Sequence, residues 1–282
     1  MATASAVASS GNIGPGFDVV ALALDLRCVV DAEPADAWSS VHVGPHAPEQ
    51  GHDLVLQAAK DAVGEDRPLQ LTVTNHIPLA RGLGSSAAAY AAGAAAALRT
   101  VEGEADPDRV FEMVSWQEGH ADNAAAAVYG GLVGVLGNGR PTQFTLAPSW
   151  RVLAAIPSFQ LLTKDARGVL PADLSRPVVV RSLSRLIALI EGLRTGDASI
   201  LSQAGGDELH EAPRGRLHPL AEGLMEVARG AGAAHACWSG AGPTILAIAV
   251  EEQVPEVSAA LTGRLDGQGE VRQLDVASEG LR

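Results

Sequence analysis

The chain has 282 residues, of which 47% are hydrophobic and 19% are charged, and its formal net charge is -13. This composition supports a sizeable core and excludes an intrinsically disordered chain, and the length allows one large α/β domain or two smaller ones. The acidic balance disfavours a nucleic-acid partner, because binding to a phosphate backbone depends on clustered Lys and Arg.

The cellular location is inferred from signals that the sequence lacks. Residues 1–10 have neither the basic nor the apolar region of a secretory signal, and no apolar run approaches the ~20 residues of a membrane helix. Cys28 and Cys237 show no zinc-binding spacing and are typical of reduced core residues. We therefore expect a soluble, cytoplasmic protein without a membrane partner.

The first half of the chain predicts a strand, a loop and a helix in succession. Residues 69–74 alternate apolar and polar side chains, as half-buried strands do. After a glycine-rich stretch, residues 85–99 are dominated by alanine, the best helix former, and Ser85 or Ser86 is available near the N-cap.

The middle of the chain continues with a helix and three strands. The helix is expected from Pro107 to about residue 116, which leaves Glu118 just beyond its end. The strands are expected at residues 132–136, 143–146 and 152–156. We predict a domain boundary near Pro148, with an N-terminal domain of residues 1–148 and a C-terminal domain of residues 149–282.

The second half predicts two amphipathic helices followed by strands. The apolar residues at helical spacing are Leu183, Leu186, Ile187 and Ile190 in the first helix, and Leu217, Leu220, Leu224 and Val227 in the second. Residues 233–238 and 244–250 are expected to be strands on either side of a Ser-Gly-Ala-Gly-Pro turn. One more helix and strand complete the expected order.

The main chemical motif is the segment from Pro78 to Ala88, Pro-Leu-Ala-Arg-Gly-Leu-Gly-Ser-Ser-Ala-Ala. Gly82 and Gly84 have no Cβ, so backbone N–H groups can approach an anion, and the following helix N-terminus adds unpaired donors and a positive dipole end. The segment lacks the Gly-Lys-Ser/Thr of a Walker A loop and the G-x-G-x-x-G of a dinucleotide site. Alone, such a loop also fits a simple tight turn between a strand and a helix.

Two further glycine-rich stretches favour a binding site over a simple turn. They are Ser9-Ser-Gly-Asn-Ile-Gly-Pro-Gly-Phe-Asp18 and Trp238-Ser-Gly-Ala-Gly-Pro-Thr244. The three stretches together resemble the signature motifs of the GHMP kinases. The resemblance implies an α+β fold in which an N-terminal ribosomal-protein-S5-domain-2-like domain and a C-terminal ferredoxin-like domain flank the active site. It also implies a kinase that uses ATP and Mg²⁺.

Three more segments resemble the homoserine kinase branch of this family. They are Glu118-Gly-His-Ala-Asp-Asn123, Thr163-Lys-Asp-Ala-Arg167-Gly-Val-Leu-Pro171 and Asp207-Glu-Leu-His-Glu-Ala-Pro-Arg214. The resemblance implies phosphorylation of L-homoserine in threonine biosynthesis. The chain departs from the family pattern at Val7, Gly11, Ala124 and Ala126, where the replacements are small and apolar.

The resemblance also assigns roles to individual residues. The ATP loop would comprise Pro78, Leu79, Ala80, Arg81, Gly82, Leu83, Gly84, Ser85, Ser86, Ala87 and Ala88, and Mg²⁺ would be held by Ser85, Ser86 and Glu118. The amino acid would contact Asn12, Asp18, His120, Arg167 and Arg214, and the catalytic group would comprise Glu118, Asp18 and Asn123. His210 would bind substrate or only support Arg214. Apart from the resemblance, adenine needs an apolar slot, which small residues of 55–63 and 82–90 could line.

Some alternatives stay open at this point. Asp18 and Asp122 are both candidates for a general base, and we expect that no strong base is used. The competing functions are another GHMP small-molecule kinase and a non-catalytic nucleotide-binding homologue. The family resemblance further implies that a homodimer is plausible.

Overall fold

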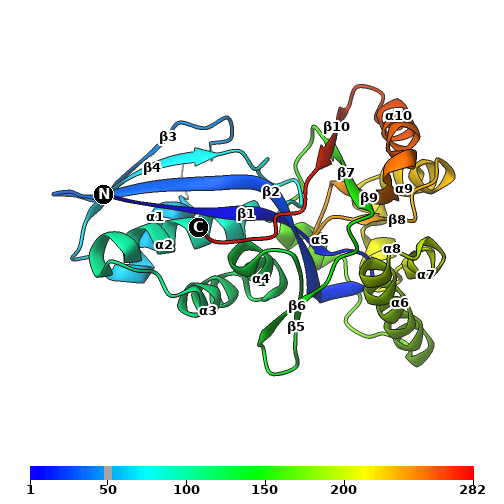
Figure 1. Ribbon diagram of the computed structural model, residues 1–282, viewed down its shortest axis with the longest axis horizontal. Helices are drawn as coiled ribbons and strands as arrows, with labels where there is room; N and C mark the ends of the chain where they lie inside the picture. Colours follow the sequence, from blue (N-terminus) through cyan, green and yellow to red (C-terminus); the bar gives the residue numbers. More distant parts are fainter. Residues whose placement is uncertain (48–52) are drawn as a thin grey trace.

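The computed structural model describes residues 1–47 and 53–282, which fold into two β-sheets with their own helices (Figure 1). The N-terminal part contains β1 (Ala2–Asn12), β2 (Gly16–Pro34), β3 (Ser39–His42), α1 (Leu54–Val63), β4 (Leu69–Asn75), α2 (Ser85–Glu102), α3 (Pro107–Glu118), α4 (Asp122–Tyr129), β5 (Leu132–Val135) and β6 (Pro141–Phe144). The C-terminal part contains β7 (Trp150–Pro157), α5 (Thr163–Gly168), α6 (Arg176–Thr195), α7 (Ala198–Leu201), α8 (Glu211–Arg214), α9 (Ala221–Gly230), β8 (His235–Trp238), β9 (Ile245–Val250), α10 (Val254–Leu265) and β10 (Gly269–Leu274).

The first sheet has the strand order β3-β4-β2-β5-β6, with β1 paired to β2. The pairs are antiparallel except β3 with β4, and β1 and β2 form one long hairpin from Ala2↔Ala32 to Asn12↔Gly16. The helices α2 and α4 pack against β1 and β2, and α1 packs against α2 (Figure 1). The small side chains of α2 allow that close packing, since a Cβ at Gly93 would lie 2.6 Å from the Val55 carbonyl oxygen.

The second sheet has the order β10-β7-β9-β8 and is antiparallel throughout. Because successive side chains of a strand point to opposite faces, β7 contributes to two cores. Leu153 and Ala155 lie in a core with α9 and α10, whereas Val152, Ala154 and Ile156 join the core of the first sheet. The two parts of the chain therefore share a continuous apolar contact.

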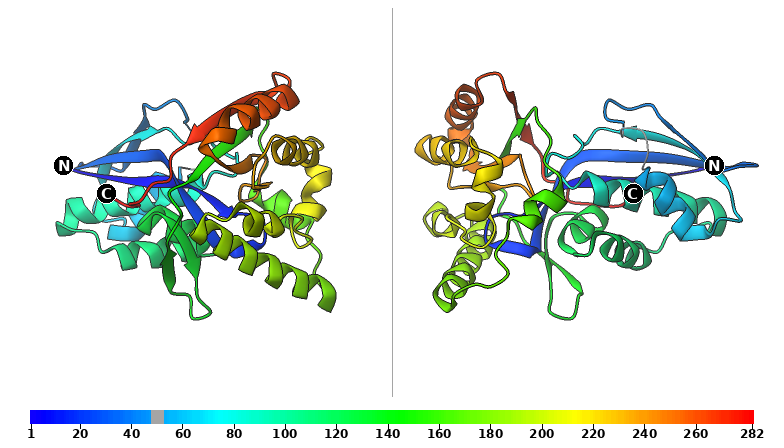
Figure 2. Two further views of the ribbon diagram at one scale, coloured as in Figure 1. Left: turned by 45° about the vertical axis from the view of Figure 1, so that its right-hand side comes forward. Right: turned by 180° about the vertical axis from the view of Figure 1, so that it is seen from behind.

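The tip of the β1–β2 hairpin reaches into the second part of the chain, as the blue strands of Figure 2 show. There the carbonyl oxygen of Gly14 lies 2.7 Å from His210 Nε2, and that of Ile13 lies 3.1 Å from His235 Nε2. Asn12, Ile13 and Gly14 all have positive φ, which produces the sharp turn. The first glycine-rich stretch is thus held between the two sheets.

Several predicted elements are confirmed. The strand at residues 69–75, the alanine-rich helix, and the last strands and helix appear close to their expected bounds. The helix expected to begin at Leu217 was predicted wrongly at its start. The chain forms a short 3-10 turn at Gly215–Leu217, and α9 begins only at Ala221. Strand β6 lies two residues before its expected position, because its register is fixed by pairing with β5.

Two local expectations also differ from the structure. Glu118 is the last residue of α3 rather than a residue beyond it, because Gly119 with φ 75° forms the C-cap. On α6, Leu183 and Ile187 are 57% and 72% exposed, whereas Leu189 and Leu193 are buried. The other two predicted positions, Leu186 and Ile190, pack against the core, so the helical period identified the helix and only part of its buried face.

The sequence did not predict the β1–β2 hairpin or α4. The domain division at residue 148 stays a prediction. Among the described helices, none is both long and apolar enough to cross a membrane.

Candidate active site

A cavity of about 310 Å³ is lined by segments from both parts of the chain. The hairpin tip, the loop before α2, the end of α3 and the start of α4 contribute from the N-terminal part. Helices α5 and α8 and the loop after β8 contribute from the C-terminal part. All three glycine-rich stretches therefore meet at one cavity.

The loop before α2 permits very little side-chain volume. Gly84 is the N-cap of α2 with φ 63°, and a Cβ there would lie 2.0 Å from Ser9 Oγ. A Cβ at Gly82 would lie 2.2 Å from the carbonyl oxygen of Ser239. Among the described residues, no side chain caps α2, so its first N–H groups remain available to an anion. Ser85 and Ser86 are therefore helical residues rather than caps.

The hydroxyl of Ser86 donates a hydrogen bond to Oε1 of Glu118. Ser85, Ser86 and Glu118 all line the cavity, beside the start of α2. Hydroxyl and carboxylate oxygens are the hard ligands that Mg²⁺ prefers. These residues thus fit a magnesium ion bound next to phosphate.

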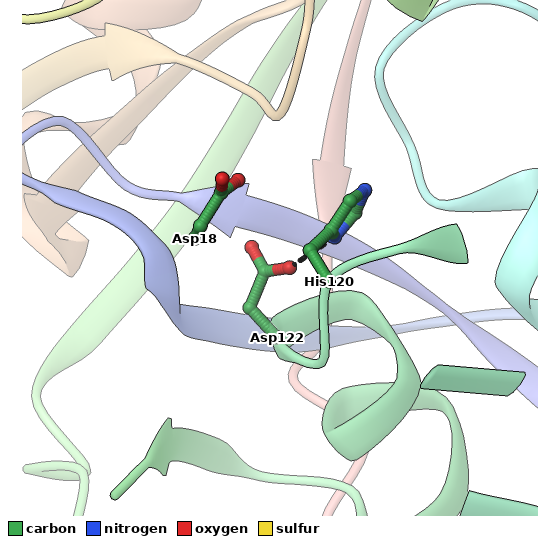
Figure 3. Close-up of side chains that lie close together, drawn as sticks. All are labelled: Asp18, His120 and Asp122. Carbon is green, nitrogen blue, oxygen red and sulfur yellow. Dashed lines mark hydrogen bonds and ion pairs between the residues drawn. The ribbon is translucent and has the colours of Figure 1, made fainter. Parts of the chain in front are cut away.

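An aspartate–histidine group also lines the cavity, and Figure 3 shows its members converging from β2, the turn after α3 and the start of α4. Nδ1 of His120 lies 2.7 Å from Asp122 Oδ1, and Nε2 lies 3.8 Å from Glu118 Oε2. Burial disfavours the imidazolium, but the hydrogen bond to Asp122 and the two carboxylate charges outweigh it and raise the pKa of His120. Asp18 completes this group, because ligand atoms of Asp18, His120 and Asp122 all lie within 4.8 Å of one another.

Arg167 on α5 forms a bidentate ion pair with Asp18. Its Nη1 and Nη2 atoms lie 3.0 Å and 2.7 Å from the two carboxylate oxygens. These hydrogen bonds raise the pKa of Arg167 against the opposing effect of burial. The two charges neutralise each other at the cavity wall.

Arg214 on α8 is held differently, by neutral acceptors inside the protein. It is 1% exposed; Nε donates to the Ala166 carbonyl oxygen at 3.2 Å, and Nη1 donates to Gly240 O and to His210 Nδ1, both at 2.9 Å. Within residues 1–47 and 53–282, its Nη2 group has no hydrogen-bond acceptor. Burial, and then the Arg167 charge, lower the pKa of Arg214 to about 10. Nη2 is therefore the nitrogen left for a ligand in the cavity.

Two asparagines hold the first glycine-rich stretch in place. Asn12 Oδ1 accepts from the Asp18 backbone N–H at 3.0 Å, and Asn12 Nδ2 donates to Gly240 O at 2.9 Å. Ser9 Oγ donates to Asn123 Oδ1 at 2.8 Å, which leaves the Asn123 amino group to face other partners. Asn12 thus joins the hairpin tip to the loop after β8.

A smaller cavity of about 110 Å³ adjoins the start of α2. Leu54, Val55, Val73 and Ala89 give it apolar walls, and Ser85 and Ser86 border both cavities. The expected adenine slot at residues 55–63 and 82–90 overlaps this lining only in part. Leu54 and Val73 were not expected.

The comparisons with known proteins agree along nearly the whole chain. The GHMP kinase N-terminal domain model matches residues 53–131, and the GHMP kinase C-terminal model matches residues 188–266. The homoserine kinase of Desulfitobacterium hafniense is 35% identical over 97% of this chain and 96% of its own length. The chain belongs to the GHMP kinase family. The predicted family and fold are therefore confirmed.

Solved structures of GHMP kinases have the same fold. A putative homoserine kinase from Listeria monocytogenes is 30% identical, with a TM-score of 0.80 over 100% of this chain and 98% of its own. A homoserine kinase from Cytophaga hutchinsonii gives a TM-score of 0.86 at 24% identity, over 100% of this chain and 96% of its own. At 24% identity, the similarity to the Cytophaga hutchinsonii structure shows the fold alone.

In this GHMP kinase, most residues predicted for the site line the larger cavity. They are Asn12, Asp18, Ala80, Gly82, Leu83, Gly84, Ser85, Ser86, Glu118, His120, Asn123, Arg167 and Arg214. The remaining loop residues do not line it: Pro78, Leu79 and Arg81 border a separate cavity, Leu79 also lines the smaller cavity beside α2, and Ala87 and Ala88 are buried in α2. Arg81 instead donates to the Ser158 carbonyl oxygen at 2.6 Å.

The structure also adds residues to the site. Leu54, Leu161 and Leu162 line the larger cavity and were not predicted. Isolated leucines carry no sequence signal for a site, because most of them pack in cores. Their position becomes visible only when the fold brings α1 and the segment before α5 together.

Proposed function

We propose that this GHMP kinase is a homoserine kinase, which transfers the γ-phosphoryl group of ATP to the side-chain hydroxyl of L-homoserine. The observation that carries the proposal is one cavity with a phosphate-type glycine loop on one side and the Asp18, Arg167 and Arg214 charges on the other. The sequence similarity to homoserine kinases supports the same substrate.

The charged side of the cavity complements a zwitterionic amino acid. Nη2 of Arg214 binds the α-carboxylate, and Arg167 adds a second cation beside it. Asp18 faces the α-ammonium group, so the amino acid exchanges contacts with an existing ion pair rather than burying an unpaired charge. A sugar or a simple alcohol does not provide both charges.

The loop side holds ATP through its phosphates. The α2 N-terminus and the glycine backbone bind phosphate oxygens, and the smaller cavity takes the adenine. Ser85, Ser86 and Glu118 hold Mg²⁺, which when bound neutralises phosphate charge. Together with Asn123, these groups place the two reactants in line.

We propose that the reaction uses no strong general base. Asp122 is 1% exposed and bonded to His120, and Asp18 is engaged by Arg167. Both carboxylates are therefore already engaged by other side chains, and neither is free to take the hydroxyl proton without giving up such a contact. Transfer then depends on positioning and on electrostatic stabilisation by the loop and the arginines, and the hydroxyl proton leaves through the transferred phosphate.

The remaining parts of the proposal concern assembly and location. The division at residue 148 lies between the two family-model matches, 53–131 and 188–266, which supports it. A homodimer is proposed from the family resemblance, and light scattering of the purified protein tests it. The cytoplasmic location stays the prediction made from the sequence.

The decisive assay measures ADP release with Mg-ATP and L-homoserine, mevalonate, galactose, shikimate or no acceptor. Turnover with L-homoserine alone is the expected result. Turnover with another acceptor would retain the kinase and replace the substrate. ATP binding without turnover on any acceptor would favour a non-catalytic homologue.

A further inference from the structure

His210 is a completely buried histidine between the hairpin tip and Arg214. Its Nε2 lies 2.7 Å from the Gly14 carbonyl oxygen, and its Nδ1 lies 2.9 Å from Arg214 Nη1. A carbonyl oxygen only accepts and a guanidinium only donates, so Nε2 carries the proton and Nδ1 offers its lone pair. One neutral tautomer therefore satisfies both contacts.

We propose that His210 is a positioning residue that orients Arg214 toward the carboxylate of the amino-acid substrate. The inference rests on the proposed function and deepens it. His210 and Gly240 take both N–H groups of Arg214 Nη1, and Ala166 takes Nε. These three acceptors fix the guanidinium plane and leave Nη2 for the substrate.

The surroundings of His210 favour this role. The Phe17 ring stacks on the imidazole at 5.3 Å, and the Arg214 guanidinium carbon lies 5.7 Å from the centroid of the same ring. Burial lowers the pKa of His210 to about 4 against the opposing charge of Asp207, whose Oδ2 lies 3.7 Å from Nε2, and the adjacent Arg214 charge acts in the same direction as burial. The imidazole thus keeps the lone pair that Arg214 requires.

The chain offers a matched control in His235, which is also buried. Its Nε2 lies 3.1 Å from the carbonyl oxygen of Ile13, next to Gly14 in the same turn. In the described part of the chain it has no hydrogen bond to an arginine. A merely structural role predicts similar effects of changing either histidine, whereas a positioning role predicts different effects on substrate affinity.

The test compares H210N, H210Q and H235N by the KM values for L-homoserine and ATP. In H210N the Asn side-chain oxygen can replace Nδ1 as the acceptor for Arg214. In H210Q the longer side chain can still donate to the Gly14 carbonyl oxygen but no longer places an acceptor beside Arg214. We expect H210Q to raise the KM for L-homoserine about 10-fold or more, and H210N about 2–3-fold. H235N should leave this KM within about two-fold, and the KM for ATP should stay unchanged in all three.

Two results would overturn the inference alone: equal KM values for H210Q and H235N, or a larger increase in H210N than in H210Q. If H210Q fails to fold, a cycle of H210N with R214K replaces it. Non-additive effects on the KM for L-homoserine support positioning through Arg214, and additive effects contradict it. A wild-type protein that does not turn over L-homoserine would instead overturn the proposed function, and this inference with it.

Discussion

The two sides of the cavity are built from different kinds of groups. The loop side presents backbone N–H groups and two hydroxyls at the start of an 18-residue helix. The amino-acid side presents charged side chains from α5 and α8, which are six and four residues long. Regular structure positions the first set, whereas hydrogen bonds to other side chains and to backbone carbonyls position the second. The loop side should therefore be sensitive to added volume, and the amino-acid side to lost polar partners.

The largest expected effect comes from the carboxylate beside the loop. Glu118→Gln removes a negative oxygen next to Ser86 and the phosphates, so kcat should fall on the order of 10²–10³-fold. The KM for L-homoserine should change little. Steady-state ADP release checks this, with Glu112→Gln on the same helix as the control. A higher KM for L-homoserine at unchanged kcat would contradict this role and would assign Glu118 to amino-acid binding.

On the amino-acid side, Arg214→Ala should raise the KM for L-homoserine about 10²-fold, and the KM for ATP far less. It also removes the Arg214 donor from the buried acceptors of Ala166 and His210, whereas Gly240 O keeps its hydrogen bond from Asn12, and this loss should cost about 1–3 kcal/mol of stability. Substrate kinetics and thermal unfolding measure the two effects. The exposed Arg216→Ala is the control, and equal effects on both substrates would contradict the assignment.

A smaller effect is expected from a methyl group added to the loop. Gly84→Ala places a side chain at φ 63° and against Ser9 Oγ, and should lower the free energy of unfolding by more than the ~1–2 kcal/mol of backbone strain alone. Gly103→Ala has a similar strain, at φ 90°, but no atom within 4 Å. The difference between the two variants in the free energy of unfolding, measured with denaturant, gives the contribution of the clash. Adding Ser9→Ala should recover part of the loss in the first variant, and no recovery would contradict the predicted contact.

The smallest effect concerns acid stability. His218 lies against Phe159 and Trp238, and burial lowers its pKa to about 4 from the ordinary 6.5. Between these pH values the unfolded chain binds the proton more readily, so stability falls as pH decreases, by at most about 1.4 kcal/mol per pH unit for each such group. His218→Phe should flatten that slope, as denaturant unfolding at pH 4.5 to 7.5 would show. An unchanged slope would assign the acid sensitivity to other buried histidines.

The difference between the two sides also explains which features could be predicted from the sequence and which could not. Local patterns identified the loop and α2, because glycine spacing and an alanine run determine them within a few residues. The strand signal of β1 was weak, since alanine and serine dominate residues 2–12 and neither favours strands. Pairing with β2 supplies the order that local preference lacks.

Side-chain partners on the amino-acid side were not predictable from local patterns. Asp18 and Arg167 are 149 residues apart, and Asn12 and Gly240 are 228 apart, so only the fold brings them together. The family resemblance identified these residues without showing that Arg167 already binds Asp18. The helical period on α6 likewise could not distinguish a face that meets the core from one that meets water.

The segment after β10 returns to the first sheet, where Val276 bridges Leu24 and the backbones of Ser5 and Arg282 exchange hydrogen bonds of 2.8 Å and 2.9 Å (Figure 1). Residues more than 250 positions apart thus complete one sheet. During synthesis on the ribosome, the first sheet therefore cannot reach its final pairing until the whole second part has emerged. The two parts should finish folding together rather than one after the other.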